Sequence, residues 1–171
     1  MSEQRSQLDA ILLVDDEPLA RMIAQARLNN ALSEEIESGR VRVAEADGLR
    51  TAIGAVRELA SKLIALVGDL QMPGTSQGQH NEFGATEREE GVAVVEAALA
   101  AGLPPERIFL LTASVDPLHM RNGPGYNPSD LQSRLASFAA ERGISLVSKA
   151  DADELFEKTL PCLVRQTLSA E

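Results

Sequence analysis

The sequence predicts an α/β domain in which five parallel strands alternate with helices, and the helices cover both faces of one sheet. Short apolar runs alternate along the chain with segments whose apolar residues recur at helical spacing, the pattern of repeated βα units. Right-handed crossovers between parallel strands then place helices on both faces, which gives a three-layer, doubly wound (βα)5 arrangement. The length of 171 residues and the apolar fraction of 44% suit one such domain with a full core.

The first half of the chain predicts three strands and two helices. Pro18 suits the first turn of a helix, and Gly39 marks the end of that helix. Apolar stripes at helical spacing consist of Leu19, Met22, Ile23 and Ala26 in the first helix, and of Leu49, Ile53, Val56, Leu59 and Ala60 in the second. The expected elements are a strand at 10–14, a helix from Pro18 to Ile36, a weak strand at 41–44, a helix from 49 to 60 and a strand at 63–67.

The second half predicts two more strands, three helices and two long irregular stretches. Residues 73–90 and 116–128 are polar and rich in turn residues, and loops of this length in a compact domain are often functional. Pro161 should kink or split the last helix. The expected elements are a helix after Gly91 (Val92, Val95, Leu99), a strand at 108–111, a helix with Leu131, Leu135, Phe138 and Ala139, a strand at 144–147, and a helix with Leu155, Phe156, Leu160, Leu163 and Val164.

Composition excludes several classes of protein. The formal net charge of -10 argues against binding the nucleic-acid backbone, which favours clustered Lys and Arg. The single cysteine, Cys162, excludes an internal disulfide framework. No apolar run approaches the roughly 20 residues that span a bilayer, and the first residues are polar. We therefore expect one domain over residues 1–171, without an output domain, in the cytoplasm and with no membrane partner.

Polar side chains follow the apolar runs at the carboxyl ends of the predicted strands. Asp15 and Asp16 follow the first strand, and Asp69 follows the third. Thr112 ends the fourth strand, and Lys149 follows the fifth. Ligands of open α/β sheets bind outside the carboxyl ends of the strands, so these groups should form one site. Three acids, a hydroxyl and a lysine together indicate a cation and a phosphoryl group.

These motifs, in this order, resemble the receiver domain of bacterial two-component response regulators, which has a flavodoxin-like sheet of order 2-1-3-4-5. The resemblance covers essentially the whole chain. The acidic pair of that family matches Asp15-Asp16, and its phosphoacceptor followed by a Met-Pro-Gly turn matches Asp69 within 69–74. The Thr-Ala motif of its fourth strand matches Thr112-Ala113, and its lysine matches Lys149.

The resemblance implies a stand-alone receiver that takes a phosphoryl group onto Asp69 from a histidine kinase or a histidine phosphotransfer protein. It implies Mg²⁺ held by Asp16 and Asp69, by Asp15 through water, and by the backbone carbonyl of Gln71. Lys149 would pair with Asp69 and then with a phosphoryl oxygen, and Thr112 would bind a second phosphoryl oxygen. Such a protein catalyses only its own phosphorylation and dephosphorylation, and it signals through a downstream protein target.

The chain departs from the family pattern at three places. Ala150 stands where the family commonly has proline after the lysine, so the loop at Lys149 should differ. Leu146 stands where the family often has an aromatic residue that rotates on activation, which places that switch in question. The stretches 73–90 and 116–128 enlarge the loops after the third and fourth strands, where they could cover the site or bind a partner.

Two other functions compete with the phosphoacceptor. A degenerate receiver would act as a docking module without phosphorylation; the intact acids and lysine argue against it, and Leu146 and Ala150 leave it open. A haloacid-dehalogenase-like phosphatase also uses a strand-end aspartate and Mg²⁺, but that family has an Asp-x-Asp motif after its first strand. The first strand here ends in Asp15-Asp16-Glu17-Pro18, which disfavours that enzyme.

Overall fold

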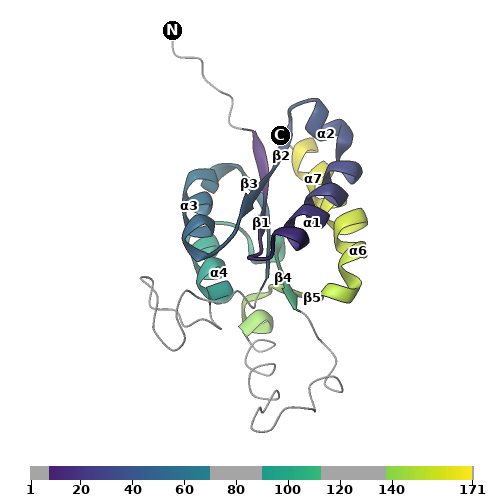
Figure 1. The fold of residues 1–171 in the computed structure, drawn as a ribbon. Coiled ribbons are helices and arrows are strands. Elements are labelled where there is room, and N and C mark those ends of the chain that lie inside the picture. The colour runs from purple at the N-terminus through teal and green to yellow at the C-terminus, as the bar shows by residue number, and fades with distance from the viewer. Residues whose placement is uncertain (1–7, 70–89, 113–137, 171) are drawn as a thin grey trace.

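The computed structural model describes residues 8–69, 90–112 and 138–170 and contains the predicted parallel sheet (Figure 1). Its five strands lie in the order β2-β1-β3-β4-β5, which confirms the predicted doubly wound topology. The strands are β1 (Asp9–Val14), β2 (Val41–Ala46), β3 (Leu63–Asp69), β4 (Ile108–Thr112) and β5 (Ser145–Ser148). The helices are α1 (Pro18–Ala31), α2 (Ser33–Glu37), α3 (Leu49–Leu59), α4 (Glu90–Ala100), α6 (Ala152–Glu154) and α7 (Leu160–Ser169).

Shorter helical turns complete the described chain. Three are 3-10 turns, and one is a π-helical segment between α6 and α7. Residues 138–142 are also helical and lead into β5. The turns are η1 (Ala60–Lys62), η2 (Pro105–Arg107), η3 (Lys149–Asp151) and the π-helical η4 (Leu155–Thr159).

Each face of the sheet carries its own apolar core. The alternation of side chains along a strand sends Leu12 and Val14 of β1 toward α3 and α4, and Ile11 and Leu13 toward α1 and α7. Figure 1 shows α3 and α4 on one side of the sheet and α1, α2, α6 and α7 on the other. β1 and β3 are buried along their whole length, as expected for central strands of a parallel sheet.

The first predicted helix differs from the structure in two respects. It is interrupted at Leu32, after two asparagines of low helix propensity, and continues as the short α2. The stripe of Leu19, Met22 and Ile23 is not its buried face, since these side chains are 55%, 59% and 45% exposed. The helix is instead anchored through Leu28, which is fully buried. Helical spacing alone identifies a stripe, and the packing of the rest of the chain decides whether it is covered.

The last helix is divided before Pro161, as predicted, by a change from α-helical to π-helical geometry. Proline lacks a backbone N–H and clashes with the carbonyl four residues earlier, which disfavours a regular helix there. The π-helical turn η4 ends two residues before Pro161 and widens the backbone where that clash would occur. The helical chain therefore continues from α6 to α7, and Leu160 stays fully buried against the sheet.

Candidate functional site

Two central strands bring three carboxylates together. The register of β1 against β3 pairs Val14 with Gly68, so the next residues, Asp15 and Asp69, lie side by side at the carboxyl ends of these strands. Oxygen atoms of Asp15, Asp16 and Asp69, which we call the acidic cluster, all lie within 4.8 Å of one another. Asp15 and Asp69 are buried, whereas Asp16 is half-buried. Such crowded carboxylates need positive charge nearby.

Lys149, which directly follows the edge strand β5, brings a positive charge to the acidic cluster. Its Nζ lies 2.8 Å from Oδ2 of Asp69 and 3.7 Å from Oδ2 of Asp15. The 3-10 turn η3 begins at this lysine, directly after β5, and Oγ of Ser148 accepts a hydrogen bond of 3.2 Å from the N–H of Ala150. The turn therefore projects the lysine over the strand ends without a proline at position 150.

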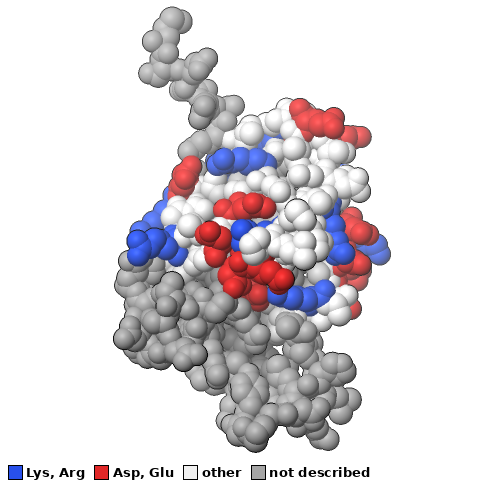
Figure 2. Space-filling view, viewed as in Figure 1, with Lys and Arg blue, Asp and Glu red and all other residues white. Residues whose placement is uncertain are grey.

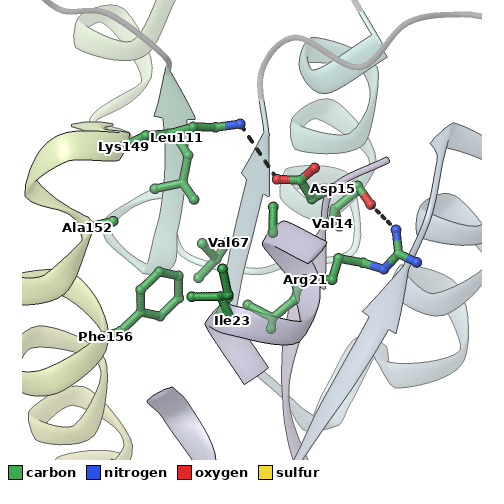
Figure 3. Close-up of a pocket in the computed structure, with 12 residues that line it drawn as sticks. Val14, Asp15, Arg21, Ile23, Val67, Leu111, Lys149, Ala152 and Phe156 are labelled. Atoms are coloured by element: carbon green, nitrogen blue, oxygen red, sulfur yellow. Dashed lines mark hydrogen bonds and ion pairs between the residues drawn. The ribbon is translucent and has the colours of Figure 1, made fainter. Parts of the chain in front are cut away.

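The turn between β1 and α1 is held by two hydrogen bonds to Asp15. The N–H of Glu17 donates to Asp15 Oδ1 at 2.9 Å, and Nη1 of Arg21 donates to the Asp15 carbonyl oxygen at 2.6 Å. Figure 3 shows the Arg21 and Lys149 side chains reaching Asp15 from opposite sides. The sequence reasoning missed Arg21, although an arginine in the first turn of a helix that follows an acidic pair could have indicated it.

Burial and neighbouring charges have opposing effects on the pKa values of Asp15 and Lys149. Burial raises the pKa of Asp15 above its ordinary value, the Glu17 N–H and Lys149 counteract that rise, and the neighbouring charges of Asp69 and Asp16 add to it. Burial alone would lower the pKa of Lys149, but the hydrogen bond from Lys149 to Asp69 and the charges of Asp69 and Asp15 raise it. The lysine is therefore charged at neutral pH.

The surface around the site is acidic. In Figure 2, Asp and Glu side chains gather near the start of α1. Exposed acids there include Glu17, and Glu45 and Asp47 lie at the end of the neighbouring strand β2. This distribution favours a cation or a basic protein surface over an anionic polymer.

The structure places the other predicted site residues as follows. Thr112 ends β4 and is buried, and it pairs in register with Ser148, while Asp69 pairs with Leu111. The threonine therefore lies on the sheet edge between Asp69 and Lys149. Leu146 packs against the core under α3 and α4. Gln71, the stretch 116–128 and all of the stretch 73–90 except Glu90 lie outside the described residues.

The structure of the chain is similar to solved structures of known proteins, although its sequence gives no match. No protein-family model matches the chain, and no curated protein matches it in sequence. The structure is similar to a response regulator receiver domain from Clostridium thermocellum, with a TM-score of 0.55 and 15% identity, over 96% of this chain and 100% of that one. It is also similar to the receiver domain of the hybrid histidine kinase CckA, with a TM-score of 0.50 and 15% identity, over 91% of this chain and 98% of that one.

The chain has the receiver-domain fold. The strand order and the coverage of whole receiver domains decide this point, which confirms the predicted fold. Among the residues that the structure describes, no helix combines the length and the apolar character needed to span a membrane.

The acidic cluster fits a small hard cation. Its donors are carboxylate oxygens, the ligands that Mg²⁺ takes, one or two at a time alongside water. Two of its three carboxylates are buried, and among the described residues Lys149 forms ion pairs with both of them. A divalent cation at the acidic cluster would offset the repulsion among these carboxylates.

Proposed function

We propose that the chain accepts a phosphoryl group on Asp69 from a phosphorylated histidine and signals through protein contacts that depend on that group. The observation that carries this proposal is the shared lysine: Lys149 Nζ lies 2.8 Å from Asp69, within a cluster of three carboxylates. An aspartate held between a cation site and a lysine is suited to attack a phosphoryl group, because such transfer depends on positioning and charge neutralisation.

Each residue then has a defined task. An oxygen of the Asp69 carboxylate would attack phosphorus, forming an acyl phosphate as the bond from phosphorus to the histidine nitrogen breaks. Lys149 lies 2.8 Å from that carboxylate before the transfer, and afterwards it would form an ion pair with a phosphoryl oxygen. Thr112, buried at the end of β4, would donate its hydroxyl to another phosphoryl oxygen. The hydrogen bonds to Asp15 from the Glu17 N–H and from Arg21 would hold the turn in place during the transfer.

Mg²⁺ is the cofactor that this proposal assigns to the acidic cluster. When bound, the ion would neutralise charge on the transferring oxygens so that a carboxylate can approach them. Asp16 and Asp69 would be its direct protein ligands, with Asp15 acting through water and the carbonyl of Gln71 completing the set.

The partners follow from the same proposal. The donor would be a histidine kinase or a histidine phosphotransfer protein, and the output would be a protein target whose binding depends on the phosphoryl group. The receiver folds of the two similar structures support this assignment.

Labelling with a small phosphodonor tests the proposal. The chain is incubated with phosphoramidate or acetyl phosphate in Mg²⁺ or in excess chelator, and its intact mass is measured beside that of Asp69→Asn. We expect one phosphoryl group on the wild type with Mg²⁺, and none on the variant or with chelator.

Two results would contradict the proposal. Asp69→Asn could label at the wild-type rate, which would place the acceptor elsewhere. Alternatively, the folded wild type could fail to label with every donor while still binding Mg²⁺, which would favour a docking module that works without phosphorylation.

A further inference from the structure

A cavity of about 200 Å³ lies beside the site, between α1 and the segment formed by α6 and η4 (Figure 3). Its floor consists of Leu13, Val67 and Leu111, from three neighbouring strands. The side chains of these three residues point to the face of the sheet that α1 covers and belong to the core on that face. The cavity therefore extends past the helices as far as the sheet. Charged residues enter its lining only at the edge nearest the acidic cluster, where Asp15, Arg21 and Lys149 contribute to the wall, and the rest of the lining is apolar.

The packing of α1 explains why the space is present. The C-terminal half of α1 is anchored by buried Leu28, and an ion pair joins Arg27 to Asp153 of α6. The N-terminal half presents Ala20 and Ala24 to the cavity, and Ala152 lies opposite. Three alanines at facing positions leave a volume that larger side chains would fill.

We infer that this cavity binds a small uncharged molecule, aromatic or branched aliphatic, of about the size of indole. An apolar cavity of about 150 Å³ lined by Leu, Ile and Phe stays dry and takes up benzene, so a volume of about 200 Å³ accommodates a somewhat larger ring system. Phe156, carried by the π-helical turn η4, supplies an aromatic wall for such a molecule. The inference does not depend on phosphorylation of Asp69.

The depth of the cavity favours a small molecule over a protein surface. The floor residues Leu13 and Val67 are 3% and 2% exposed, so a partner lying across α1 could reach them only with one inserted side chain. Of the exposed stripe of Leu19, Met22 and Ile23, only Ile23 lines the cavity, and the stripe could serve a second copy of the chain instead. The experiment therefore separates these two occupants.

The full chain is titrated with indole while methyl resonances are followed by NMR. Ile23 and Val67 report from the cavity, and Ile53 reports from the opposite core. We expect saturable shifts at Ile23 and Val67 and no shift at Ile53. Ala24→Leu fills the cavity and should weaken indole binding at least about tenfold, whereas Ala26→Leu, at an exposed position of the same helix, should bind like wild type.

Three results would overturn the inference. Shifts that do not saturate, or that are equally large at Ile53, mean non-specific contact. Equal affinity in Ala24→Leu and Ala26→Leu places the molecule elsewhere, and Ala20→Leu repeats this comparison if Ala24→Leu does not fold. Sedimentation that shows an indole-free dimer, abolished by Ala24→Leu, assigns the cavity to a second copy.

Discussion

Replacing Lys149 with methionine should destabilise the chain at neutral pH, because the acidic cluster would lose the positive charge that pairs with Asp69 and Asp15. Methionine keeps an unbranched side chain of similar length and removes only the charge and the hydrogen bonds. In the wild type, Lys149 Nζ lies 2.8 Å from Asp69 and 3.7 Å from Asp15, both of which are buried. The variant leaves these carboxylates facing each other without that charge.

The size of the effect follows from the distances. Two unit charges 4.8 Å apart, the outer limit for the acidic cluster, repel by about 3.5 kcal/mol at an effective dielectric constant of about 20. The lysine side chain is 34% exposed, so water screens part of the attraction that offsets this repulsion. We therefore expect a loss of about 2 kcal/mol in the free energy of unfolding, which lowers the urea midpoint by about 1 M.

Urea unfolding followed by circular dichroism measures this loss, with Lys158→Met as the matched control. Lys158 is exposed on η4, so its replacement should change the midpoint little. Added Mg²⁺ should stabilise Lys149→Met more than wild type. The variant lacks the competing charge of the lysine and should bind the ion more tightly, and an ion that binds only the folded state adds stability that rises with the logarithm of its affinity. Equal midpoints for wild type and Lys149→Met, or equal stabilisation of both by Mg²⁺, would refute the reasoning.

Three further predictions address the switch, the turn and acid stability. Thr112→Ala should label nearly normally yet lose the change in hydrogen exchange on phosphorylation; an unaltered change would remove Thr112 from the switch. Arg21→Ala removes the 2.6 Å bond to the Asp15 carbonyl and should weaken Mg²⁺ binding about fivefold by calorimetry, and an unchanged Kd would assign that bond to stability alone. The hydrogen bond from Arg165 lowers the pKa of buried Glu35, so the stability that this pair contributes is present above the ordinary value of 4.5 and is lost as pH falls through the folded pKa. Arg165→Ala should lower Tm by a few degrees at pH 7 and by less below pH 4.5; an equal loss at both would contradict this assignment.

The sequence was sufficient to predict the sheet and the meeting of the site residues. Each apolar run is short and ends at a polar residue, and parallel strands bring their carboxyl ends to one edge, which is why Asp15 and Asp69 meet. Thr112 and Lys149 arrive at the same edge for the same reason. The strands, and the residues at their carboxyl ends, could therefore be predicted from the pattern of apolar residues along the chain.

Features decided by packing between elements were not predictable. The stripe of Leu19, Met22 and Ile23 has helical spacing, yet α1 is anchored through Leu28, and the stripe stays exposed. The bond from Arg21 to a main-chain carbonyl depends on the turn geometry, which residue types alone do not specify. Pro161 predicted a kink or a split, and the regular helix is divided before it, but the π-helical form of the turn between the two pieces could not be predicted from residue types.

The most direct test of the central claim is to trap the acyl phosphate and locate it. Borohydride reduces an aspartyl phosphate to homoserine, so the chain is labelled with phosphoramidate and Mg²⁺, reduced, digested and sequenced by mass spectrometry. We predict homoserine at position 69, dependent on both donor and Mg²⁺, in a chain whose Asp15 and Asp16 are unmodified. Homoserine at another aspartate, or a phosphoryl group that labels the chain and leaves no homoserine at position 69, would contradict the claim.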